Sequence, residues 1–144
     1  MNKKEALNKL DALEKEASEL REIINREETL MERVKTYSDV CKELNIEELK
    51  LKDFNFLPKN QQKKALAFSK IQNIVELFNE GWEPDWADSV QKKYYPYFDC
   101  QGSFRFGDFH YLYYSFRGEA GFYKNKELAI YCGKQFQDIY KDLL

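Results

Sequence analysis

The chain has 144 residues, 33% of them charged, and a formal net charge of only −2 at pH 7. This length suits one ordinary domain with a short appendage. The balanced charge argues against the dense basic surface of a strong phosphate binder. No apolar run is long enough to span a bilayer, and the polar residues 1–5 lack the apolar core of a signal peptide. We therefore expect a cytoplasmic protein.

Residues 3–35 are predicted to form one long helix. They contain no Gly or Pro, and strong helix formers dominate the segment. Apolar residues recur in a heptad pattern, which indicates a coiled coil. Further apolar residues widen this stripe, as in a helix packed on its own domain. Both alternatives stay open, and we favour homo-oligomerisation through Leu10, Leu13, Leu20, Ile24 and Met31.

Residues 36–144 are predicted to form a globular α+β domain with three helices. The first covers 36–46, with Ser38 as its N-cap and Asn45 at its end. The second covers 60–79 and is followed by a glycine, Gly81. The third covers 126–144, capped by Asn125, and carries Cys132 on its apolar face.

A sheet is predicted between the last two helices, because residues 94–123 hold 13 of the 23 aromatic residues. The expected fold is α+β: a four-stranded antiparallel meander packed with the helices 60–79 and 126–143, preceded by the long coiled-coil-like helix. A two-residue hairpin is expected at Gly107-Asp108. The expected strands are 94–98, 103–106, 109–116 and 120–124.

The segments 81–86 (GWEPDW), 93–98 (KYYPYF), 122–128 and 131–144 resemble a family of small uncharacterised proteins encoded by bacteriophages and prophages of Bacteroidetes. Residues 36–44 are also similar to this family. The resemblance covers about the last two-thirds of the chain, and the long helix over 3–35 departs from the family pattern. It implies a phage setting inside a bacterial host cell, and no activity.

The sequence shows no pattern that indicates catalysis. His110 is the only histidine, and acid–base chemistry needs a positioned partner that the spacing does not identify. The three cysteines, Cys41, Cys100 and Cys132, are widely spaced and form no metal-ligand motif. Nothing places Cys100 beside His110. We therefore expect no enzyme, no catalytic residue, no cofactor and no metal.

One face of the predicted sheet is the candidate binding face. Aromatic side chains on strands with basic neighbours can stack on single-stranded nucleic acid. Tyrosine is also the usual residue at a half-wet surface that covers a core or a partner. The basic footprint is weak, which favours the second interpretation. The candidate binding residues are His110, Tyr114, Phe116 and Arg117.

The sequence thus favours a non-enzymatic phage accessory protein. We expect it to act as a homo-oligomer in the host cytoplasm and to bind a macromolecular partner, most simply a host protein. The alternative is single-stranded nucleic-acid binding through the aromatic sheet. The sequence does not identify the partner or fix the number of subunits.

Overall fold

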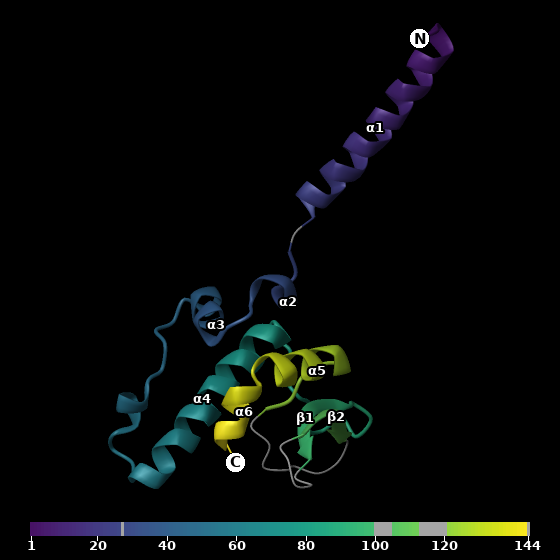
Figure 1. Cartoon of the computed structure of the whole chain (residues 1–144). Helices are drawn as coiled ribbons and strands as arrows, with labels where there is room; N and C mark the ends of the chain where they lie inside the picture. Colours follow the sequence, from purple (N-terminus) through teal and green to yellow (C-terminus); the bar gives the residue numbers. More distant parts are fainter. Residues whose placement is uncertain (27, 100–104, 113–120, 144) are drawn as a thin grey trace.

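The computed structural model describes residues 1–26, 28–99, 105–112 and 121–143 (Figure 1). Helices make up most of the described chain, and one pair of strands lies between α4 and α5. The elements are α1 (Lys3–Asn25), α2 (Leu30–Arg33), α3 (Tyr37–Leu44), the 3-10 helix η1 (Leu51–Phe54), α4 (Lys59–Asn79), β1 (Lys93–Asp99), β2 (Arg105–Leu112), α5 (Lys126–Gln135) and α6 (Gln137–Leu143).

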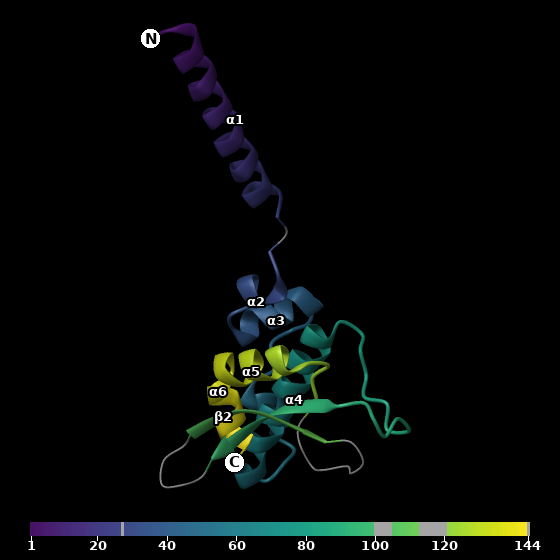
Figure 2. The same cartoon turned by 90° about the vertical axis from the view of Figure 1, so that its right-hand side faces the viewer.

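The helix α1 extends away from the rest of the chain (Figures 1 and 2). It begins with a capping box, in which the Glu5 main-chain N–H donates to Asn2 Oδ1 and the Asn2 N–H donates to Glu5 Oε2, each at 2.9 Å. It ends at Asn25, and Arg26 is extended. In the described structure none of its residues is buried.

The single helix predicted over 3–35 is divided into α1 and α2, and threonine caps begin both α2 and α3. The main-chain N–H of Thr29 donates to Glu32 Oε2 at 2.8 Å at the start of α2. At the start of α3, Asp39 N–H donates to Thr36 Oγ1 at 3.2 Å and Asp39 Oδ2 accepts from Thr36 N–H at 2.9 Å. Each pair satisfies main-chain groups at a new helix start. The predicted N-cap at Ser38 is therefore wrong.

The core lies among α2, α3, α4, α5 and α6. In the described chain, α4 packs against α3 and α6, and α5 packs against both strands (Figure 2). Burial of these apolar faces is the main stabilising contribution to the fold. The buried residues of this core are Val34, Tyr37, Val40, Cys41, Ile71, Ile74, Phe78, Tyr123, Leu128, Ala129, Cys132, Phe136 and Tyr140.

The end of α4 is fixed to the segment that precedes α5. The helix ends as expected before Gly81, whose φ of +86° favours glycine, and Glu80 is also left-handed. Buried Asn79 donates its Nδ2 to the Phe122 carbonyl oxygen at 2.7 Å. Its Oδ1 accepts from Lys124 N–H at 3.1 Å. One buried amide thus joins two segments that are far apart in sequence.

The predicted four-stranded meander is wrong, because the described residues contain one antiparallel pair, β1 with β2. Gly107-Asp108 forms no hairpin; both residues lie inside β2. The pairing shifts between Tyr95↔His110 and Tyr97↔Gly107, which leaves two β2 residues opposite Pro96. Proline has no N–H to donate to a ladder, so a bulge at this place is physically reasonable.

The expected fourth strand over 120–124 is reduced to an isolated bridge between Tyr94 and Tyr123. The hydrogen bonds of Asn79 occupy the main-chain groups on either side of this bridge. Residues 100–104 and 113–120, which hold parts of the expected second, third and fourth strands and their turns, lie outside the described residues. The last helix is divided at Phe136 into α5 and α6.

Candidate functional site

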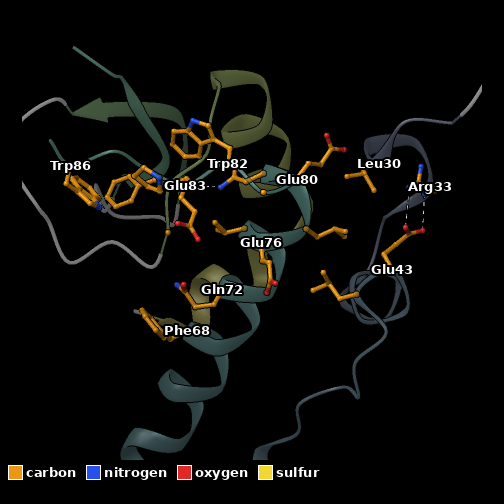
Figure 3. A pocket seen from close by; sticks show the side chains of 18 residues that line it. Leu30, Arg33, Glu43, Phe68, Gln72, Glu76, Glu80, Trp82, Glu83 and Trp86 are labelled. Carbon is orange, nitrogen blue, oxygen red and sulfur yellow. Dashed lines mark hydrogen bonds and ion pairs between the residues drawn. The ribbon is translucent and has the colours of Figure 1, made fainter. Parts of the chain in front are cut away.

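An open groove of about 1130 Å³ lies beside α4, and we call it the acidic groove (Figure 3). Its walls come from α2, α3, α4, the loop 80–86 and residues 121–122. Aromatic, aliphatic and acidic side chains share its surface. The lining residues are Leu30, Arg33, Glu43, Leu44, Phe68, Gln72, Val75, Glu76, Leu77, Asn79, Glu80, Gly81, Trp82, Glu83, Pro84, Trp86, Gly121 and Phe122.

One face of α4 forms the floor of the groove. Phe68, Gln72, Val75 and Glu76 line it at helical spacing and therefore project from the same side of the helix. Gly121 packs directly on this floor, because a Cβ added there would lie 2.6 Å from Val75 Cγ2. A glycine is thus required for the close approach of the segment before α5.

Two tryptophans form an aromatic wall. Trp86 packs edge-on against Phe122, with 5.3 Å between the ring centroids. Trp82 packs beside Phe122 and Tyr95. The fully buried Lys93 supports the loop: its ammonium lies 5.3 Å from the Trp86 ring centroid and donates to the Gln91 carbonyl oxygen at 2.9 Å. Packing and a cation–π contact therefore fix the wall.

The groove has a net negative lining. Glu43 accepts bidentate hydrogen bonds from the Arg33 guanidinium, at 2.9 and 3.2 Å. This hydrogen bonding lowers the pKa of the Glu43 carboxyl group. Glu80 lies 3.5 Å from the Lys124 ammonium. Glu76 and Glu83 have no hydrogen-bond or ion-pair partner within the described part of the chain. Two carboxylates are thus available beside aromatic surface.

The predicted oligomerisation residues are largely brought together on α1. Leu10, Leu13 and Leu20 are 51%, 53% and 53% exposed, and Ile24 is 78% exposed. Within the described structure α1 does not pack on its own domain. Met31 differs, because it lies on α2 and packs against the core of the same chain.

The predicted binding face is represented by one residue. His110 lies on β2, where its main chain is opposite Tyr95. Tyr114, Phe116 and Arg117 lie outside the described residues.

Buried thiol and phenol groups form a separate cluster in the core. The hydroxyl oxygens of Tyr123 and Tyr140 are 3.0 Å apart, and burial raises the pKa of the Cys132 thiol. A buried, protonated thiol is a poor nucleophile. Within the described ranges no group of His, Cys, Asp and Glu side chains could hold a metal ion. No described helix combines the length and apolar character needed to cross a membrane.

Sequence reasoning missed the acidic groove. Its signal was the segment Trp82–Trp86, which places two indoles and two carboxylates directly after the end of a helix. Exposed aromatic residues in a loop often mark a binding surface. Comparisons of the chain with protein-family models, with curated proteins and with solved structures found no match.

Proposed function

We propose that this chain is a non-enzymatic phage accessory protein that binds a host protein in the host cytoplasm and acts as a homo-oligomer. The observation that carries the proposal is the acidic groove, whose lining combines Trp82 and Trp86 with Glu76 and Glu83, two carboxylates that have no partner among the described residues. The partner segment that fits it carries Lys or Arg side chains next to apolar ones.

The chemistry of the groove supports this partner. Carboxylates form charge-assisted hydrogen bonds with ammonium and guanidinium groups. Indole rings attract the same cations and also cover the aliphatic stems of Lys and Arg. Phe68 and Val75 on the floor add apolar surface for neighbouring side chains. An acidic or phosphate-bearing ligand would meet repulsion from the same carboxylates.

The exposed stripe of α1 supports the homo-oligomer. Six large apolar side chains of this helix are at least half exposed: Leu7, Leu10, Leu13, Leu20, Ile23 and Ile24. A contiguous apolar surface of this kind is typical of an interaction site. Joining two chains would place two grooves on one particle, which raises the effective affinity for a partner with repeated basic segments. The phage setting comes from the sequence resemblance alone.

The groove can be tested by tryptophan fluorescence, because both tryptophans of the chain line it. Short peptides of basic, acidic and uncharged composition, each with apolar residues interspersed, are titrated into the protein. We expect only the basic peptides to change the tryptophan emission. Replacing Glu76 and Glu83 with Gln should weaken this binding about tenfold or more, since each charged hydrogen bond contributes about 1.5–3 kcal/mol.

The matched control replaces Glu47 and Glu48 with Gln. These residues are exposed and lie outside the groove, so the same loss of charge should leave peptide binding within about twofold, as for screened charges at a distance. Equal binding of acidic and basic peptides would contradict the proposed partner. So would tight, salt-sensitive binding of a single-stranded oligonucleotide, which would favour the nucleic-acid alternative.

A further inference from the structure

We infer that α1 pairs with α1 of a second copy in parallel and in register. This inference rests on the proposed homo-oligomer and adds the orientation of its helices, which places both globular parts at the same end of the pair. The evidence is the apolar stripe of α1, which has no buried residue in the described structure, together with the charges on its two flanks.

The contact positions of α1 run along its whole length. In a heptad written abcdefg, positions a and d face the partner helix. The helix has 23 residues, which corresponds to about 34 Å. Arg26 is extended and ends the stripe. The a and d positions within α1 are Lys3, Ala6, Leu10, Leu13, Ala17, Leu20 and Ile24, of which all but Lys3 are apolar.

Charged residues flank these contact positions in an order that suits a parallel pair. Lys9 and Glu16 occupy g positions, and Glu14 and Arg21 occupy e positions. In a parallel, in-register pair, each g residue faces the e residue of the following heptad in the other chain. Lys9 then faces Glu14 of the second copy, and Glu16 faces Arg21. Both contacts join opposite charges, and symmetry repeats each of them.

Two charged residues on the outer face of α1 pair with each other. Lys15 and Glu19, which lie away from the contact positions, form an ion pair within the helix at 4.0 Å. Such pairs stabilise an exposed helix and do not compete with the g and e residues for partners. The flanking charges of α1 are therefore available to a second copy.

An antiparallel pair is less favourable. Residues at g then face g, and residues at e face e. The register that keeps every contact position opposes Glu14 to Glu14 and Glu16 to Glu16 of the second copy. Shifting by one heptad avoids this repulsion. In one direction, however, the shift leaves Ala6 and Leu10 without a facing residue of α1; in the other it leaves Ile24 without one and opposes Leu20 to Lys3. The parallel register keeps all the contact positions and both charge contacts.

Two charge reversals test the orientation. Lys9→Glu opposes a carboxylate to Glu14 of the second copy, and Glu14→Lys opposes an ammonium to Lys9. Each variant alone should self-associate about tenfold more weakly at low salt, because two attractive contacts become repulsive. Mixed in equal amounts, the two variants should form a heterodimer with the affinity of the unmodified chain, measured by sedimentation equilibrium.

The controls are Lys4→Glu and Glu22→Lys, which make the same charge changes at positions away from the contact face and should self-associate like the unmodified chain. In the antiparallel register, Glu14→Lys would instead pair best with the unmodified chain, and that result would overturn the inference while leaving the homo-oligomer intact. An unmodified chain that stays monomeric would overturn both. Pairing of the two variants no tighter than either alone would also contradict the parallel register.

Discussion

The Tyr131 hydroxyl on α5 donates to the Val34 carbonyl oxygen at 2.7 Å, and it lies 2.8 Å from the Met31 carbonyl oxygen. Its single hydrogen is therefore shared between two carbonyl groups at the end of α2. Gln135 Nε2 adds a third contact by donating to the Lys35 carbonyl oxygen at 2.7 Å. These bonds attach residues 31–35, which follow α1 in the chain, to α5 in the globular part.

Tyr131→Phe removes this anchor and keeps the ring. We expect the free energy of unfolding to fall by about 1 kcal/mol, because two carbonyl groups lose a partly buried donor. Urea denaturation measures the loss. Trypsin should also cut faster after Arg33 and Lys35, since the main chain there is held less firmly. An unchanged cleavage rate would show that the Tyr131 hydroxyl is not needed to hold α2 in place.

Gly121→Ala tests the close approach to the floor of the acidic groove. The new methyl group would collide with Val75, a β-branched side chain that cannot rotate freely in a helix. We expect a loss of about 1–3 kcal/mol in urea denaturation. The same substitution in a Val75→Ala background should cost clearly less, because the space is then free. An equal loss of unfolding free energy in both backgrounds would contradict a close contact between Gly121 and Val75.

The helices of the globular part could be predicted from sequence because their signals are local. The end of α3 at Asn45, with φ of +54°, and the cap of α5 at Asn125 both follow from the preferences of single residues. The division of the first helix was also signalled, since Thr29 and Glu32 have the spacing of a capping box. The uniformly helix-forming composition of residues 3–35 concealed that signal.

The sheet could not be predicted from composition, because aromatic residues serve cores as well as strands. Phe122 and Tyr123 fit a strand pattern, yet Asn79 binds the main chain around them and Tyr123 fills the core. That contact joins residues more than forty positions apart. The acidic groove also depends on contacts between distant parts of the chain, since Glu76 and Trp86 line one surface only after folding. It could therefore not be predicted from local sequence.

Alkaline pH should destabilise the fold through Tyr37. Burial, followed by the neighbouring Cys41, raises the pKa of this phenol to about 12, from about 10 in the unfolded chain. Because the pKa is raised in the folded state, the contribution of the neutral Tyr37 phenol to the free energy of unfolding is fully present below pH 10 and is lost as the pH rises from 10 to 12. Urea denaturation at a series of pH values measures the fall, and Tyr37→Phe should make it shallower. An equally steep fall in that variant would contradict the assignment to Tyr37.

We propose above that the exposed apolar stripe of α1 makes this protein a homo-oligomer. Light scattering of the intact chain at a concentration on the order of tens of micromolar tests it most directly. We predict a mass of twice the 17.3 kDa of one chain. Replacing Leu13 and Leu20 with Asp should return the mass to that of one chain, because buried unpaired charge at these contact positions is costly. A monomer for the unmodified chain, or an unchanged mass for the Leu13→Asp and Leu20→Asp variant, would contradict the claim.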